Sequence, residues 1–282
     1  MKFNHHFLKS IIKPFEFDIP GHNKIDSLFL SIMKGFVTLK NENKVGKIHF
    51  FHPKGNSLPS TIIKSLIDCL NRAENDPDIN IVLLESRGSS TFCSGASLSE
   101  LKSVKDIKSG TAFFMGFAEL LNKVRKMSKF VFARVHGKVV GGGVGLVSAC
   151  DYVFATEKAS IKLSELSIGL GPYVIEPAVS RKIGNTAFTQ LSIDSSNWKT
   201  AKWGMENGLY AHLSPDIETM DEALNEKAEL VASYTPEAIS QLRKLHWKNT
   251  QHWETLLPEN AKITAQLVLS DYSQNFMKSL NQ

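Results

Sequence analysis

Cysteine is scarce in this sequence of 282 residues, and its three copies, Cys69, Cys93 and Cys150, are widely spaced. Because the number is odd and no two form a CxxC pair, neither a disulfide framework nor a zinc motif is indicated. The metalloprotease pattern HExxH is missing as well, and we expect no metal site. A chain without disulfides is expected in a reducing compartment, so we predict a cytoplasmic protein.

Long apolar runs are also missing, because none approaches the roughly 20 residues that a membrane-spanning helix requires. We therefore expect no membrane partner. Blocks of lysine and arginine interleaved with aromatic residues are absent and the net charge is only +5, so nucleic acid is a weak hypothesis. A slightly basic protein would also suit a phosphorylated small molecule as its ligand.

The common nucleotide and hydrolase motifs are incomplete. Gly137-Lys138-Val139 lacks the hydroxyl residue of a P-loop, and no GxSxG nucleophile elbow occurs. Residues 143–148 (GVGLVS) approach the dinucleotide fingerprint GxGxxG but end in serine, and no acidic residue ends the next predicted strand. A dehydrogenase is therefore a minor alternative, and we expect no separate cofactor.

Short strands alternate with helices over most of the chain, which predicts an α/β fold with largely parallel strands. Apolar or β-branched segments predict strands at 36–40, 47–52, 81–85, 130–135, 152–155 and 160–163. The first two flank a turn at 41–46 and read as a hairpin. Helices are predicted at 61–73 and 111–127, and beyond about Ser195 the pattern turns wholly helical, at 199–207, 220–233, 236–249 and 258–278.

We predict three regions, with an N-terminal extension over 1–32, a core over 33–225 and a helical region over 226–282. The extension is interrupted by Pro14, Pro20 and Gly21 and has no sustained period, so we expect it to be poorly ordered. It also lacks the apolar core and small-residue cleavage site of a signal peptide and the Arg-rich character of a transit peptide.

The stretch 130–151 (FVFARVHGKVVGGGVGLVSACD) combines a buried strand, three consecutive glycines and a short apolar helix. A helix start leaves main-chain N–H groups unpaired, and the helix dipole adds partial positive charge there. Glycines let a ligand approach the backbone closely. The pattern predicts a place to hold a negatively charged oxygen.

Two further segments accompany it, a second glycine turn at 92–98 (FCSGASL) and a lone carboxylate, Glu165, in 162–172 (KLSELSIGLGP). In this order and at these separations the three segments resemble the enoyl-CoA hydratase/isomerase, or crotonase, superfamily. The run 165–184 (ELSIGLGPYVIEPAVSRKIG) is most similar to methylglutaconyl-CoA hydratase-like members. The resemblance covers most of 35–280 and implies a crotonase-type ββα spiral core followed by a C-terminal helical trimerisation region.

The resemblance also implies roles for single residues. The N–H groups of Ala96 and Gly142 would form an oxyanion hole for a thioester oxygen, and Glu165 would move the proton. The loop Ser94, Gly95, Ala96, Ser97 and Leu98 would bind coenzyme A, which is part of the substrate, and Lys54 and Ser57 would line the same groove. The partner is an acyl-CoA thioester, and the assembly would be a homotrimer or a dimer of trimers.

Two departures from the family pattern bear on the reaction. Gly145 stands where straight-chain hydratases carry a second glutamate, and Ser97 stands where aspartate is common. We therefore predict an enoyl-CoA hydratase for a branched or carboxylated acyl chain that works with one glutamate. A Δ3–Δ2 enoyl-CoA isomerase and a non-catalytic acyl-CoA binding protein remain alternatives. Tyr173 and Glu176 are expected at a helix N-terminus rather than at the acyl pocket.

Overall fold

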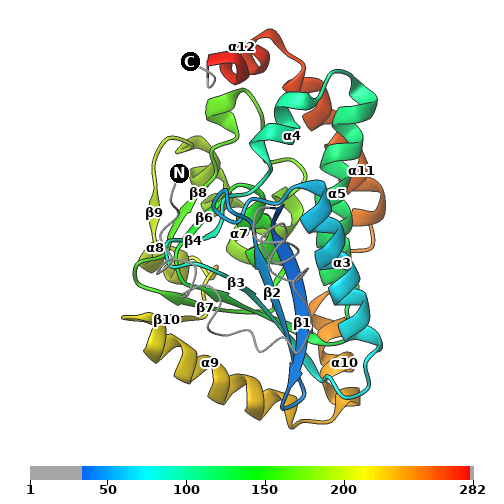
Figure 1. Cartoon of the computed structure of the whole chain (residues 1–282), viewed down its shortest axis with the longest axis vertical. Helices are drawn as coiled ribbons and strands as arrows, with labels where there is room; N and C mark the ends of the chain where they lie inside the picture. The colour runs from blue at the N-terminus through cyan, green and yellow to red at the C-terminus, as the bar shows by residue number, and fades with distance from the viewer. Residues whose placement is uncertain (1–33, 280–282) are drawn as a thin grey trace, which may run out of the picture.

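The computed structural model describes residues 34–279, and the predicted extension 1–32 lies outside them. Two sheets form the core (Figure 1). The larger has the order β1 (Phe36–Glu42), β2 (Val45–Phe51), β3 (Ile81–Ser86), β5 (Phe130–Val135), β7 (Tyr152–Thr156) and β10 (His212–Ser214). The smaller has the order β4 (Thr91–Cys93), β6 (Lys138–Val140), β8 (Ser160–Lys162) and β9 (Lys199–Thr200).

The predicted hairpin is confirmed, because β1 and β2 pair antiparallel from Phe36 opposite Phe51 to Glu42 opposite Val45. All other neighbours in the large sheet pair in parallel, as the alternation of strands and helices predicted.

The apolar strand β3 contributes side chains to two hydrophobic cores, because successive side chains point to opposite faces of the sheet. Val82 and Leu84 join the main core, and Ile81 and Leu83 join a smaller core under α9 (Ile217–Ala232).

Helices cover both faces of the large sheet (Figure 1). One face carries α3 (Ser60–Asn75) and α5 (Ile107–Lys126), and the other carries α9. Asp106 caps α5 by accepting a hydrogen bond from Ser109 N–H at 2.7 Å. Arg134, the one charged residue of β5, reaches the α9 side and donates to Asp221 Oδ2 at 2.8 Å. The ion pair explains why a cation is tolerated within an apolar strand.

The remaining helices comprise one long helix, α7, several short ones and those of the C-terminal region. They are α4 (Leu98–Ser103), α6 (Gly142–Ala149), the 3-10 helix η1 (Leu166–Ile168), α7 (Glu176–Ile193), α8 (Ala201–Glu206), α10 (Pro236–His246), α11 (Trp253–Val268) and α12 (Asp271–Ser279). Among the helices between residues 34 and 279, none has the length and apolar character needed to cross a membrane.

The prediction of purely helical structure beyond Ser195 is wrong in two places. Strand β9 pairs antiparallel with β8, and β10 pairs in parallel with β7 at the edge of the large sheet. Strands of two and three residues are too short to show a period of two. The last predicted helix, 258–278, is in fact two helices, because α11 ends at Val268 and α12 begins at Asp271, and α11 already contains Pro258 in its interior. The predicted boundary between 225 and 226 falls within α9, and the division into regions stays a prediction.

Two glycines of α5 provide a matched test of how closely this helix packs. A Cβ on Gly110 would lie 2.9 Å from Ala265 Cβ of α11, whereas a Cβ on Gly116 would meet only ordinary contacts at 3.6 Å. We expect Gly110→Ala to reduce the free energy of unfolding by about 1–3 kcal/mol through overpacking. Gly116→Ala should raise it by about 0.5–1 kcal/mol through helix propensity. Urea unfolding of both variants checks this, and equal effects would contradict the packing.

Candidate active site

The small sheet brings three loops of distant sequence to one edge. Strand β4 pairs with β6, and β6 pairs with β8, all in parallel. Because the carboxyl ends of parallel strands meet at one edge of a sheet, the residues that follow these strands lie together. These are 94–96 after β4, 141–143 after β6 and 163–165 after β8. Strand pairing therefore joins the three segments that sequence analysis singled out.

The first two loops touch through their backbones. Gly95 has φ +80°, and a Cβ there would lie 2.7 Å from Val140 O and 3.1 Å from Gly142 N. Only glycine combines that backbone angle with so close an approach. In the described chain, neither Ala96 N–H nor Gly142 N–H donates a hydrogen bond to another residue. Gly142 is also the first residue of α6, so the helix dipole favours negative charge beside its N–H.

Glu165 reaches the same place from β8. Gly141, with φ +53°, leaves room for the carboxyl group, because a Cβ there would lie 2.9 Å from Glu165 Oε1. Glu165 Oε2 is buried and has no hydrogen-bond partner within the described residues. Burial away from water disfavours the charged form and raises the pKa of Glu165 to about 7. A carboxyl group with this pKa exchanges a proton readily at neutral pH.

These groups share one cavity of about 300 Å³. Its walls include Ser94, Ala96, Leu98, Gly142 and Glu165 from the predicted site. The other lining residues are Leu101, Phe114, Phe117, Ser164, Ile168, Leu170, Gly171, Pro172, Val174, Ile175, Thr264 and Phe276. In the described part of the chain, no Lys, Arg or His lines this cavity, and Glu165 is its one carboxylate. The cavity is an apolar chamber with donors and a single acid–base group on its wall.

The remaining predicted residues lie beside the cavity rather than on its wall. Gly95 makes the backbone contact described above, and the Ser97 hydroxyl accepts from Glu100 N–H at 3.4 Å as the cap of α4. The Ser57 hydroxyl is 2.8 Å from His52 Nδ1, and the exposed Lys54 accepts from the Ser94 hydroxyl through its main-chain oxygen at 3.2 Å. The loop at 53–59 thus touches the glycine turn at 92–98, and the role of this loop in coenzyme A binding stays a prediction.

Sequence reasoning missed several residues that complete the cavity wall. Phe114 and Phe117 come from α5, and Thr264 and Phe276 come from the C-terminal helices α11 and α12. Their spacing fits ordinary packing faces, so no local signal separates them from the core. The turn after Glu165 also contributes through Pro172, Val174 and Ile175, while neighbouring Tyr173 and Glu176 do not line the cavity, as expected.

Gly145 explains why the chamber has only one carboxylate. It lies on the second turn of α6, and a Cβ there would lie 2.4 Å from Ile175 Cγ2 and 2.7 Å from Ile175 Cβ. A longer side chain would displace Ile175, which is buried and lines the cavity. The apolar side chain of Ile175 therefore occupies the space into which a second acidic group at 145 would project.

A family model described as enoyl-CoA hydratase/isomerase matches residues 40–280. The chain belongs to this family. It is 29% identical over 205 residues to a short-chain-enoyl-CoA hydratase of Clostridium acetobutylicum, which covers 72% of this chain and 77% of that protein. It is 25% identical to the human mitochondrial Δ(3,5)-Δ(2,4)-dienoyl-CoA isomerase, over 67% of this chain and 61% of that protein.

The fold agrees with this membership of the enoyl-CoA hydratase/isomerase family. The crystal structure of an enoyl-CoA hydratase from Bacillus halodurans superposes with a TM-score of 0.81 at 18% identity, covering 86% of this chain and 99% of that one. The predicted α/β crotonase-type core with a C-terminal helical region is thereby confirmed. The relatives include both hydratases and isomerases, so the reaction must be argued from the site itself.

The raised pKa of Glu165 predicts a stability change in Glu165→Gln. Unfolded Glu165 ionises near its ordinary value of 4.5, while the folded group ionises near 7, so the native state binds the extra proton between these pH values. Unfolding free energy should therefore fall as pH rises through this window, and the penalty is fully present above pH 7. At about 1.4 kcal/mol per pKa unit, the glutamine variant should be more stable by up to about 3 kcal/mol at pH 8.

This advantage should vanish at and below about pH 4.5, where both states of the wild type are protonated. Urea unfolding of both proteins across this range measures it. The exposed Glu157 supplies the control variant Glu157→Gln, which should show no such dependence. A stability difference between Glu165→Gln and wild type that stays constant with pH would contradict the buried carboxyl.

Proposed function

We propose that this protein is an enoyl-CoA hydratase that adds water across the 2,3 double bond of a branched enoyl-CoA. The N–H groups of Ala96 and Gly142 hold the thioester oxygen, and Glu165 transfers the proton. The observation that carries this proposal is the Glu165 carboxyl, whose buried Oε2 has no hydrogen-bond partner among the described residues, on the wall of the same apolar cavity as Ala96 and Gly142.

In this mechanism, ionised Glu165 takes a proton from water while the water oxygen bonds to Cβ of the substrate. The electron pair of the double bond moves toward the carbonyl, and the enolate oxygen accepts hydrogen bonds from the two amides. Protonated Glu165 then returns its proton to Cα, which completes the addition. Each amide is worth about 3–4 kcal/mol of the barrier if it is aimed at the enolate oxygen.

The character of the cavity wall supports an apolar acyl chain. Ile175, Val174, Leu170 and the two phenylalanines of α5 offer apolar contacts. A carboxylated acyl group would have to leave water without a cation on the described wall, which is costly for a charged group. The apolar wall therefore gives no support to a substrate with a second carboxylate, and we propose the branched chain on the resemblance of 165–184 to methylglutaconyl-CoA hydratase-like proteins.

A Δ3–Δ2 isomerase is the second candidate, and the single carboxylate favours it. Moving a double bond needs only one group that takes a proton from C2 and returns it to C4, and Ile175 fills the space beside Gly145.

A third candidate is an acyl-CoA binding protein without turnover. For all three we propose that 94–98, with Lys54 and Ser57, binds coenzyme A, and that the C-terminal helices form a homotrimer or a dimer of trimers.

Turnover of a panel of straight, branched and carboxylated 2-enoyl-CoA and 3-enoyl-CoA thioesters tests the proposal. Hydration should consume the conjugated double bond and incorporate ¹⁸O from labelled water, with branched apolar chains preferred over carboxylated ones. Glu165→Gln should lower kcat by about 10²–10⁴-fold, as loss of an acid–base group does, while acyl-CoA binding persists. Wild-type kcat in this variant would exclude the mechanism.

The other outcomes identify the alternatives. Conversion of 3-enoyl to 2-enoyl thioesters without ¹⁸O incorporation would identify the isomerase. Tight acyl-CoA binding with no turnover on any member of the panel would identify the binding protein. The pH profile adds a further check, since kcat/KM for hydration should rise with pH through about 7 as Glu165 ionises. A profile without this step would argue against Glu165 as the base.

A further inference from the structure

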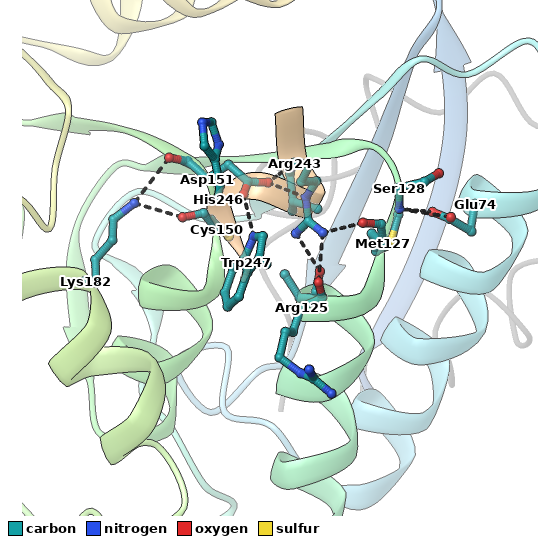
Figure 2. Close-up of polar contacts among 12 residues, drawn as sticks. Glu74, Arg125, Met127, Ser128, Cys150, Asp151, Lys182, Arg243, His246 and Trp247 are labelled. Atoms are coloured by element: carbon teal, nitrogen blue, oxygen red, sulfur yellow. Dashed lines mark hydrogen bonds and ion pairs between the residues drawn. The ribbon is translucent and has the colours of Figure 1, made fainter. Parts of the chain in front are cut away.

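A buried ion pair lies at the far end of the helix that carries Gly142. Arg243 of α10 is 1% exposed and donates from Nε to Asp151 Oδ2 at 2.8 Å, two residues after α6 ends (Figure 2). With eight residues, α6 spans about 12 Å. The pair therefore lies roughly one short helix away from Gly142, and neither residue lines the cavity.

Asp151 ties the end of α6 to the neighbouring strand and to α10. Besides Arg243, its carboxylate accepts from Val131 N–H of β5 at 2.8 Å and from Trp247 Nε1–H at 2.9 Å. Its own N–H donates to Val131 O at 2.7 Å. Lys182 of α7 donates to Cys150 O at 2.9 Å and so satisfies a free carbonyl at the helix end (Figure 2).

Arg243 uses its remaining donors on the end of α5. Nη2 donates to Val124 O at 2.6 Å, and Nη1 donates to Arg125 O at 2.9 Å and to Met127 O. These are carbonyls of the last turn and the cap of α5, where a cation also complements the helix dipole. One guanidinium group thus joins the carboxyl ends of α5 and α6, with β5 held through Asp151.

Both helices contribute to the cavity from their other parts. Gly142 begins α6, and Phe117 of α5 lies against it so closely that a Cβ on Gly142 would be 2.4 Å from Phe117 Cε1. A shift of α6 along α5 would move the Gly142 amide past this ring. The relative position of the two helices therefore fixes where the amide points.

The chemistry of the contact also indicates positioning rather than stability alone. Replacing a buried ion pair by well-packed apolar side chains is often neutral or stabilising, so a pair of this kind is a poor device for stability. Arg243 and Asp151 instead set the direction of neighbouring elements, because Arg243 donates to three main-chain carbonyls at the end of α5 and Asp151 accepts from a main-chain N–H of β5.

We propose that Arg243 and Asp151 are positioning residues for the oxyanion hole. They lock α6 against α5 and hold the Gly142 amide in place beside Phe117. The inference rests on the proposed function of Gly142 as an oxyanion donor. It adds a residue from the C-terminal helices that controls catalysis without contacting the substrate.

The test uses the full chain and a saturated, unreactive branched acyl-CoA. Isotope-edited infrared spectroscopy measures the carbonyl stretch of the bound thioester, which moves to lower wavenumber when two amides polarise it. The variants are Arg243→Lys and the milder Trp247→Phe, which removes one hydrogen bond from Asp151 and keeps the charge pair. Arg134→Lys is the matched control, since it makes the same change in an ion pair, with Asp221, that bonds neither α5 nor α6.

We expect Arg243→Lys to lose at least half of the carbonyl shift and to lower kcat by about tenfold or more, the order of weakening one oxyanion donor. KM should change by less than about threefold, because the donor acts mainly on the transition state. Trp247→Phe should show a smaller loss in both, and Arg134→Lys should keep the wild-type shift and kcat.

Two results would overturn the inference, and they differ from each other. If the wild type polarises the carbonyl and folded Trp247→Phe and Arg243→Lys polarise it equally, the positioning role is wrong while the proposed function stands. If the wild type binds the thioester without any shift, the proposed oxyanion hole is wrong and the inference fails with it. If Arg243→Lys does not fold, Trp247→Phe decides between the first result and the expected one.

Discussion

The close approach of three backbone turns is the constraint on which the site depends. Gly95 lies against Val140 O and Gly142 N, and Gly141 leaves space for the Glu165 carboxyl. Any side chain at these positions would separate the turns or push the carboxyl away. Parallel pairing of β4, β6 and β8 supplies the approach, and the glycines permit it. Ala96, Gly142 and Glu165 line one cavity because of this arrangement.

The second constraint is the cost of burying Glu165. Glu165 Oε2 is buried without a hydrogen-bond partner among the described residues, and a carboxyl group in such a place lowers stability at neutral pH. Ile168 of η1, next to Glu165, accepts a hydrogen bond from the Ser273 hydroxyl of α12 at 3.0 Å, and Phe276 of the same helix lines the cavity. The C-terminal helices thus help to enclose the cavity that holds the carboxyl group. The same burial raises the pKa of Glu165, which suits the proposed proton transfer, and lowers the stability of the folded protein.

Much of the fold and the centre of the site could be predicted from the sequence, for identifiable reasons. Long apolar strands, a hairpin turn and consecutive glycines are local patterns, whereas the roles expected for Glu165, Ala96 and Gly142 came from the resemblance to the enoyl-CoA hydratase/isomerase family. Phe114, Phe276 and Arg243 could not be found this way, because their roles depend on contacts between elements far apart in sequence. Strands β9 and β10 were missed because so few residues carry no period.

The most direct measurement is a crystal structure of the protein with an unreactive branched acyl-CoA bound. The account predicts the thioester oxygen at about 2.7–3.1 Å from both the Ala96 and Gly142 nitrogens, the range for productive oxyanion donors. It also predicts Glu165 Oε2 facing the α and β carbons of the acyl chain, with the chain running between Phe117 and Ile175. A thioester oxygen bound away from either amide, or an acyl chain outside this cavity, would contradict it.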